Sequence, residues 1–566
     1  MSKKRVLIFG FDGATFDLIK PWIKQGKLPA FAKLMKEGTY GELKSSPDTM
    51  SPSAWASFST GKNPGGHGIY NFMDIIPGTV DMHYLNSTHR DGETIWGALN
   101  KSGKKTIVLN VPMTYPADKV DGCMITGWNA PNIKSKGFTY PDSLIDDILK
   151  EQGDYVLFPT VKRHMVKDRP DLALKEIHNE FDLKTSVTRT LMKKYDWDFL
   201  VTVVLATDQV QHYFWHFMDK KHRDYVEAAK EFEDAIYGIY KRCDDFVTEI
   251  LATLDEDTTI IVMSDHGNGI NQGGVQFMVP WLSKIGMMAD FKNTPPSLVQ
   301  NPLLWSKSKG KRMLKKQYVW LNNHLSVKAK GFLNGLFPGI RDRVESSWRL
   351  SAVDWKKTKC FFHYSPRVNL KGREPFGIIE PGKEYNEILD LVIQKLYESR
   401  DTVTGECIVD KVFKRDEVFH GAHIDEAPDT VVWWKEGLVI SGIISTDING
   451  KEVVITEKDI GDPRTGNHTP YGIFIGKGKE FRKGVEVKGL EIIDLAPTVL
   501  HIMGEPVPSE MDGKVAKETF TDAFLKSRPI QYTKGDGDNA PKNEQSYSPD
   551  EEKTVEETLR GLGYIE

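Results

Sequence analysis

Three apolar runs in this sequence lead directly to an aspartate. They are residues 5–11 before Asp12, residues 198–207 before Asp208 and residues 258–264 before Asp265. Continuous apolar runs of this kind are typical of strands that are buried on both faces, as in a parallel sheet. A fourth run at residues 105–111 has the same form, and helical patterns stand between the runs. We therefore expect an α/β fold with a mainly parallel central sheet that is flanked by helices.

The acidic ends of these strands predict a ligand site. In open α/β sheets the carboxyl ends of the strands form the ligand crevice, so Asp12, Asp208 and Asp265 should converge. His212 follows Asp208 at a spacing of four residues, and His266 follows Asp265 directly. Aspartate and histidine suit Zn²⁺ or Mn²⁺, and a pair of such ions can clamp the oxygens of a phosphoryl displacement. Taken singly, either Asp/His pair is more simply explained as a loop with satisfied side chains.

A short helix is predicted at residues 51–61. Ser51 has the place of the N-cap, Pro52 that of the first helical residue and Gly61 that of the C-terminal stop. One interpretation is that Ser51 only caps the helix. The other is that Ser51 attacks phosphorus as an alkoxide next to a divalent ion. The two are compatible, because a helix N-terminus also presents N–H groups to an anionic phosphate.

Composition and charge limit the binding partners and the cellular location that we expect for the protein. The chain has 566 residues, a formal net charge of -4 and four cysteines. This charge argues against general nucleic-acid binding, and no apolar run reaches the ~18 residues of a membrane-spanning helix. The cysteines are far apart in sequence, and the apolar run after the basic N-terminus is too short for a secretory signal. We therefore expect a reducing, cytoplasmic location.

A basic segment interrupts the α/β pattern. Between residues 301 and 350, eleven Lys or Arg are opposed only by Asp342 and Glu345, and large apolar residues lie between them. We expect this segment to form a cap over the active site. The alternative belongs to a different class of function: the protein would bind an anionic membrane through residues 301–350. The predicted parts of the chain are a discontinuous catalytic core at 1–278 and 351–526, a basic insertion at 279–350, and a linker with a C-terminal helical tail at 527–566.

Several motifs occur in an order that is shared with a known family. In chain order they are Asp12-Gly13, residues 51–69, residues 110–116, Asp208-x-x-x-His212, residues 264–267, residues 369–375, residues 427–429 and Gly466-Asn467-His468. This order resembles the alkaline phosphatase superfamily, and within it the type I phosphodiesterase/nucleotide pyrophosphatase branch. Ser51 stands where this branch usually has a threonine, whereas other members of the superfamily have serine there. The resemblance implies an alkaline-phosphatase-like core that binds two divalent metal ions.

The resemblance also implies a role for each matched position. One ion would be held by Asp208, His212 and His468, and the other by Asp12, Asp265, His266 and the oxygen of Ser51. Ser51 would be the nucleophile, and a covalent phospho-enzyme would form on it and then be hydrolysed. The ions would be Zn²⁺, with Mn²⁺ as the alternative.

The positions that would recognise the substrate match the family's pattern less closely than the metal-binding positions do. Nucleotide pyrophosphatases have an asparagine that contacts the phosphate, and simple alignment places it at Phe72, one residue from Asn71. The candidate substrate-binding residues are Asn71, Lys371 and Arg373. A sulfatase is disfavoured, because the nucleophile does not lie in a Cys-x-Pro-x-Arg motif.

The expected function is that of a two-metal phosphoester hydrolase of the phosphodiesterase or nucleotide pyrophosphatase type. Alternatives within the superfamily are a phosphomonoesterase and a phosphotransferase or mutase, in which an acceptor other than water receives the phosphoryl group. The expected substrate is a small-molecule or lipid-linked phosphoester, and no specific nucleic-acid partner is expected. Peripheral membrane contact through residues 301–350 would be compatible with a lipid-linked substrate.

Overall fold

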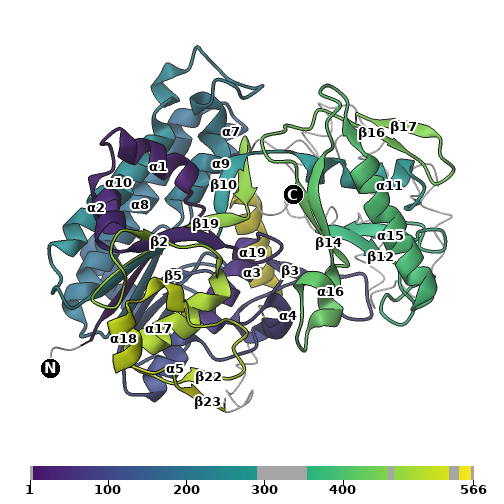
Figure 1. Ribbon diagram of the computed structural model, residues 1–566. Helices are drawn as coiled ribbons and strands as arrows, with labels where there is room; N and C mark the ends of the chain where they lie inside the picture. Colours follow the sequence, from purple (N-terminus) through teal and green to yellow (C-terminus); the bar gives the residue numbers. More distant parts are fainter. Residues whose placement is uncertain (1–3, 290–352, 457–463, 535–546, 563–566) are drawn as a thin grey trace.

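A large sheet forms the centre of the bigger of two lobes (Figure 1). The computed structural model describes residues 4–289, 353–456, 464–534 and 547–562, and in these residues the sheet has ten strands. Their order is β20 (Val485–Glu486), β2 (Thr39–Lys44), β19 (Tyr471–Lys477), β9 (Thr259–Met263), β1 (Val6–Phe11), β8 (Phe199–Val204), β5 (Thr106–Val111), β6 (Gly122–Thr126) and β7 (Thr139–Tyr140), with β21 (Leu490–Glu491) paired to β2. Neighbouring strands from β9 to β6 are parallel, whereas β19 and β7 run antiparallel to their neighbours. The predicted α/β fold with a mainly parallel central sheet is confirmed.

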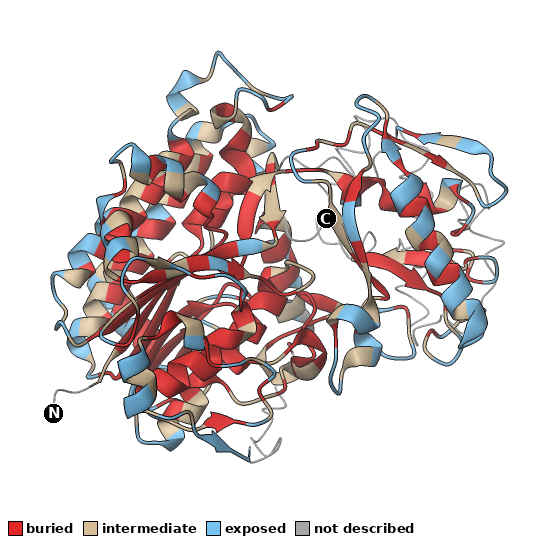
Figure 2. Cartoon of the chain, viewed as in Figure 1, coloured by how far each residue is buried: buried red, intermediate tan, exposed pale blue. Residues whose placement is uncertain are grey.

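Helices cover both faces of this sheet (Figure 1). One group contains α1 (Phe16–Lys24), α2 (Pro29–Glu37), α8 (Pro170–Lys194), α9 (Ala206–Met218) and α10 (Ala235–Leu251). The other group contains α3 (Ser51–Thr60), α5 (Ile95–Lys101) and α17 (Leu495–Met503). Every residue of β1, β5, β8 and β9 is buried as a result, which is why these strands read as continuous apolar runs (Figure 2).

The register of the central strands brings their carboxyl ends level. Val6 of β1 lies opposite Phe199 of β8 and Thr259 of β9, and Gly10 lies opposite Val203 and Met263. The three aspartates that follow these strands therefore leave the sheet at the same edge.

A second hydrophobic core lies in the smaller lobe, at the right of Figures 1 and 2. Apart from Val80, its buried residues come from 277–288 and 353–455. Its elements are α11 (Met278–Lys284), β11 (Cys360–His363), β12 (Ser365–Val368), α15 (Lys383–Glu398), β14 (Val409–Lys414), β15 (Thr430–Trp434), β16 (Ile443–Thr446) and β17 (Glu452–Ile455). Most of the basic insertion expected at 279–350 lies outside the described residues, and the domain boundaries stay a prediction.

His423 connects the two lobes. Its Nε2 lies 2.5 Å from a carboxylate oxygen of Asp91, and its Nδ1 lies 3.3 Å from Glu426. The backbone N–H of His423 donates to the carbonyl oxygen of Gly65, and its own carbonyl oxygen accepts from the hydroxyl of Tyr70. The hydrogen bonds to Glu426 and Asp91 outweigh partial burial and raise the pKa of His423 to about 9.

We expect this histidine to make stability depend on alkaline pH. A raised pKa stabilises the folded state fully below the unfolded pKa of about 6.5, and this contribution is lost as the pH rises through about 9. Because solvent screens this partly exposed group, the free energy of unfolding should fall by roughly 1 kcal/mol more in the wild type than in His423→Gln between pH 7 and pH 10. Urea unfolding of both proteins at the two pH values measures this difference, and equal pH dependence would contradict it.

Among the described residues, none of the helices combines the length and the apolar character that crossing a membrane requires.

Candidate active site

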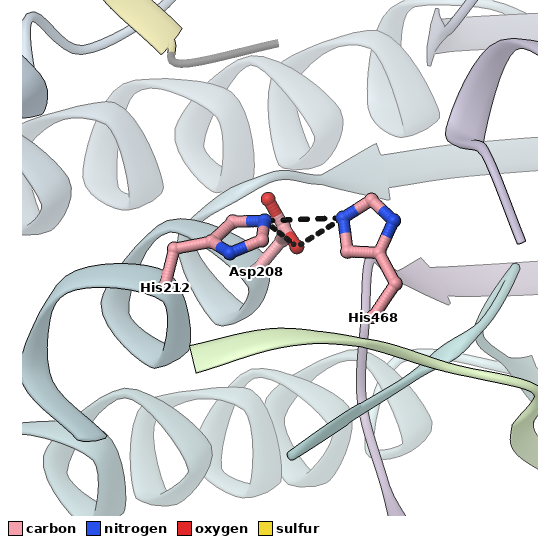
Figure 3. A group of neighbouring side chains, drawn as sticks. All are labelled: Asp208, His212 and His468. Carbon is pink, nitrogen blue, oxygen red and sulfur yellow. Dashed lines mark hydrogen bonds and ion pairs between the residues drawn. The ribbon is translucent and has the colours of Figure 1, made fainter. Parts of the chain in front are cut away.

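Asp208, His212 and His468 form the first of two candidate metal groups (Figure 3). Nε2 of His212 lies 3.1 Å from Oδ1 of Asp208 and 3.1 Å from Nε2 of His468. Nε2 of His468 lies 3.6 Å from the same carboxylate oxygen. Asp208 and His212 are one turn apart on α9, which starts where β8 ends, so the helix presents both on one face.

Backbone carbonyls fix how the two histidines are turned. Nδ1 of His212 lies 2.8 Å from the carbonyl oxygen of Gly466, and Nδ1 of His468 lies 2.8 Å from that of Thr49. A carbonyl oxygen only accepts, so each Nδ1 carries the proton that it donates. With the proton on Nδ1, Nε2 of each ring points its lone pair toward the other ring and toward a carboxylate oxygen of Asp208. Converging lone pairs of this kind suit a bound cation.

Asp12, Asp208 and His266 form the second candidate group, and Asp265 lies against it. Nε2 of His266 lies 3.3 Å from Oδ2 of Asp265 and 3.7 Å from Oδ1 of Asp12. Nδ1 of His266 donates to the carbonyl oxygen of Gly267, which again leaves Nε2 facing the carboxylates. Because burial lowers the pKa of His266 well below its usual range, this ring is neutral at pH 7.

Two of the carboxylates in this group have an oxygen that accepts no hydrogen bond from the described residues. These atoms are Oδ1 of Asp12 and Oδ2 of Asp265, and both side chains are completely buried. Burial and the neighbouring negative charges raise the pKa of Asp12 and of Asp265 well above the usual range. Buried carboxylates are stable when a cation or a hydrogen-bond donor compensates them, so the donor set fits divalent ions.

Trp55 holds the Asp12 side chain through a hydrogen bond. Its indole N–H donates to Oδ2 of Asp12 at 3.0 Å. A Cβ atom on Gly10 would lie 2.7 Å from the Trp55 ring, so the glycine in β1 leaves the space that the indole occupies. The remaining oxygen of Asp265, Oδ1, accepts from the backbone N–H of Gly13.

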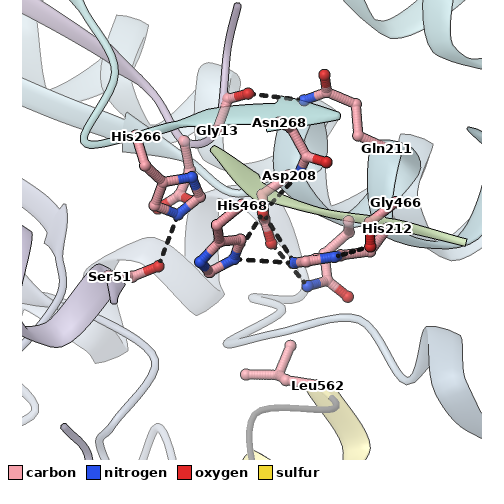
Figure 4. A network of polar contacts seen from close by, with 12 residues as sticks. Gly13, Ser51, Asp208, Gln211, His212, His266, Asn268, Gly466, His468 and Leu562 are labelled. Atoms are coloured by element: carbon pink, nitrogen blue, oxygen red, sulfur yellow. Dashed lines mark hydrogen bonds and ion pairs between the residues drawn. The ribbon is translucent and has the colours of Figure 1, made fainter. Parts of the chain in front are cut away.

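Ser51 lies beside the second group. Its hydroxyl is 3.1 Å from Nε2 of His266, and the residue is fully buried (Figure 4). The prediction that Ser51 is the N-cap is wrong by one residue, because Met50 has the cap position and Ser51 is the first residue of α3. Gly61 ends α3 in the left-handed conformation with a φ of 66°, as predicted. The Ser51 hydroxyl is therefore directed at the site from the N-terminus of the helix.

The structure also shows two site residues that the sequence analysis missed. The amide nitrogens of Asn268 and Gln209 lie 3.4 Å and 3.2 Å from the two oxygens of Asp208. Asn268 is two residues after His266, in β10 (Gly267–Ile270), and it pairs with His468 in β18 (Gly466–Thr469). Its place two residues after His266 is the sequence signal that could have indicated Asn268; no comparable pattern indicates Gln209.

The three candidate substrate-binding residues contact other residues of the protein. Asn71 is buried, and its side-chain oxygen accepts from the backbone N–H of Phe72. Lys371 forms an exposed ion pair with Glu380. Arg373 forms ion pairs with Asp429 and Glu374 in the smaller lobe. These contacts give the three residues local partners, and their role with substrate stays a prediction.

Comparison with known proteins gives a match over most of the chain. The sequence profile of the family described as type I phosphodiesterase / nucleotide pyrophosphatase matches residues 6–459. A search of curated proteins found no match.

Solved structures with a similar arrangement include human ectonucleotide pyrophosphatase / phosphodiesterase 5. It has 13% sequence identity and a TM-score of 0.46, covering 92% of this chain and 100% of the other. An inactive murine form of the same protein in complex with AMP has 13% identity and a TM-score of 0.47, with 92% and 100% covered. Phosphonoacetate hydrolase from Sinorhizobium meliloti 1021, in complex with phosphonoformate, has 12% identity and a TM-score of 0.48, with 87% and 94% covered.

The family match covers well over half of the sequence and includes the strands that carry Asp12, Asp208 and Asp265. The resemblance inferred from the motif order is confirmed. The chain belongs to the type I phosphodiesterase/nucleotide pyrophosphatase family.

Proposed function

We propose that this protein is a metal-dependent phosphodiesterase that works through a covalent phosphoserine at Ser51. Membership of the family supports a phosphoester hydrolase of the phosphodiesterase or pyrophosphatase type. The observation that carries the finer proposal is the position of the Ser51 hydroxyl, 3.1 Å from His266 and at the edge of two converging Asp/His groups.

Each group would hold one divalent ion. Asp208, His212 and His468 would hold the first, and Asp12, Asp265, His266 and Ser51 would hold the second. Such ions act as Lewis acids that favour the serine alkoxide and neutralise charge on phosphoryl oxygens. The mixed nitrogen and oxygen donors suit Zn²⁺, and Mn²⁺ is the alternative.

The residues of the chain would carry out a double displacement. The Ser51 oxygen would attack phosphorus, a bond from Oγ to phosphorus would form, and the bond to the leaving oxygen would break. Water would then attack the same phosphorus and release Ser51. The N-terminus of α3 would favour the phosphate, because its first backbone N–H groups have no partner within the helix.

The cellular setting that we propose is a reducing one. All four cysteines, Cys123, Cys243, Cys360 and Cys407, are free. Three of them are buried, so they are packed as apolar residues rather than paired in disulfides. This supports the cytoplasmic location expected from the sequence.

The test compares two chromogenic substrates. Metal-stripped protein is resupplied with Zn²⁺ or Mn²⁺ and assayed with bis(p-nitrophenyl) phosphate and p-nitrophenyl phosphate. We expect metal-dependent turnover with the diester preferred. Turnover of the monoester alone would favour a phosphatase, product formation that depends on an added alcohol would favour a phosphotransferase, and turnover without metal would contradict the proposal.

A further inference from the structure

The C-terminal helix α19 (Pro549–Leu562) docks on the larger lobe with a continuous apolar face. Val555, Leu559 and Leu562 are completely buried, and their spacing of four and three residues places them on one side of the helix. The helix contacts α7 (Val161–Met165), which in turn contacts α9. The tail is therefore part of the hydrophobic core of this lobe.

Contacts made by Tyr547, just before α19, and by residues within α19 fix this helix on the larger lobe. The ring of Tyr547 stacks on that of Tyr115 with centroids 5.7 Å apart and an angle of 4° between the planes. The Tyr547 hydroxyl donates to the carbonyl oxygen of Asn129 at 2.8 Å. Further along α19, Glu556 and Arg560 form a mostly buried ion pair at 3.0 Å. These contacts give the helix a defined position on the lobe.

The end of the helix meets the helix that carries the first metal group. The hydroxyl of Tyr213 donates to the carbonyl oxygen of Leu562 at 3.3 Å. Tyr213 is the residue after His212 on α9, and Figure 4 draws Leu562 in the same view as Asp208, His212 and His468. The last carbonyl groups of a helix have no partner within it, so the tyrosine satisfies one of them.

The direction of α19 is also favourable for a cation site. The C-terminal end of a helix carries partial negative charge, and this end contacts α9 at Tyr213, the residue after His212. The opposite end begins with Asp550, Glu551 and Glu552, which suit the positive end of the helix dipole.

We propose that α19 is a positioning element of the active site, which holds α9 through Tyr213 and Leu562 so that Asp208 and His212 keep the geometry of the first metal group. This inference rests on the proposed function for its catalytic consequence. The contact between α19 and α9 itself does not depend on that function, so the two can be tested separately.

The first experiment compares the full chain with a form that ends at residue 546. Amide hydrogen exchange of residues 206–218 in the metal-free proteins reports on α9 directly, and we expect faster exchange in the shortened form. Affinity for Zn²⁺, measured by competition with a chromophoric chelator, should fall about 10–100-fold, as it does when residues that orient metal ligands are removed. A synthetic peptide of residues 547–566 should restore both values.

A milder variant keeps the test decisive if the shortened form does not fold. Tyr213→Phe removes only the hydroxyl, and we expect about a fivefold loss of Zn²⁺ affinity together with faster exchange of α9. Tyr237→Phe on α10 is the matched control and should change neither. A lower kcat at an unchanged KM for bis(p-nitrophenyl) phosphate would accompany the loss, because the change acts on the metal group and not on the bound ester.

Three outcomes would overturn the positioning role. The first is unchanged exchange of α9 and unchanged Zn²⁺ affinity in Tyr213→Phe and in a folded shortened form. The second is unchanged Zn²⁺ affinity with faster turnover of bulky diesters in the shortened form, which would make α19 a steric wall instead. The third is a failure of the peptide to restore exchange protection. If the full chain neither binds Zn²⁺ nor hydrolyses either ester, the proposed function fails, and the exchange measurement alone decides the role of α19.

Discussion

Replacing Ser51 by alanine is expected to lower kcat for bis(p-nitrophenyl) phosphate by about 10⁴-fold or more. The substitution removes the oxygen that would form the bond to phosphorus, and the loss of a nucleophilic serine is among the largest single effects in hydrolases. KM should change much less, because the other groups around the phosphate remain. Steady-state kinetics of the metal-loaded variant, with its Zn²⁺ content measured in parallel, gives both values.

Ser59→Ala is the matched control for this variant. Ser59 is buried in the same helix, but its hydroxyl donates to the carbonyl oxygen of Ala56 within α3. Its loss should leave kcat within about twofold, because it removes only a local hydrogen bond. Comparable losses in the two variants would show that Ser51 supports α3 rather than the chemistry.

Replacing Asp208 by asparagine is expected to reduce both metal binding and turnover. The amide keeps the shape of the side chain but removes the negative charge that faces His212 and His468. Loss of a metal that stabilises the transition state by several kcal/mol corresponds to about 10³–10⁴-fold in kcat. Mass spectrometry for metals after dialysis should find about one ion less per chain than in the wild type.

Asp244→Asn is the matched control for Asp208→Asn, because it also removes one buried negative charge. Asp244 is also completely buried, but it lies on α10 and accepts from the backbone N–H of Phe31. We expect this variant to keep its metal content and its kcat. Full metal content and activity in Asp208→Asn would contradict the assignment of the first metal group.

The sequence was sufficient to predict the sheet and the convergence of its acidic ends. Strands β1, β8 and β9 are buried on both faces, so their apolar runs are unbroken and easy to recognise. Asp12, Asp208 and Asp265 follow these strands, and a parallel sheet brings such positions to one edge. The site could therefore be located before any side-chain contact was known.

Other parts of the site depend on pairings that local sequence patterns do not determine. His468 is placed beside His212 by the antiparallel pairing of β18 with β10, and only the family resemblance indicated it. Asn268 contacts Asp208 through tertiary structure, across 60 residues of sequence. The docking of α19 joins segments that are more than 300 residues apart, as in the contact between Tyr213 and Leu562. Helix α3 begins at Ser51, one residue earlier than predicted. Differences of one or two residues are common at helix ends.

The stereochemistry of hydrolysis at phosphorus tests the central claim most directly. A p-nitrophenyl phosphorothioate diester of one known configuration is hydrolysed by the metal-loaded enzyme in ¹⁸O-labelled water, and the configuration of the product is determined. Attack by Ser51 followed by attack of water inverts phosphorus twice, so we predict net retention. Net inversion would mean that water attacks the substrate directly, and it would contradict a covalent phosphoserine at Ser51.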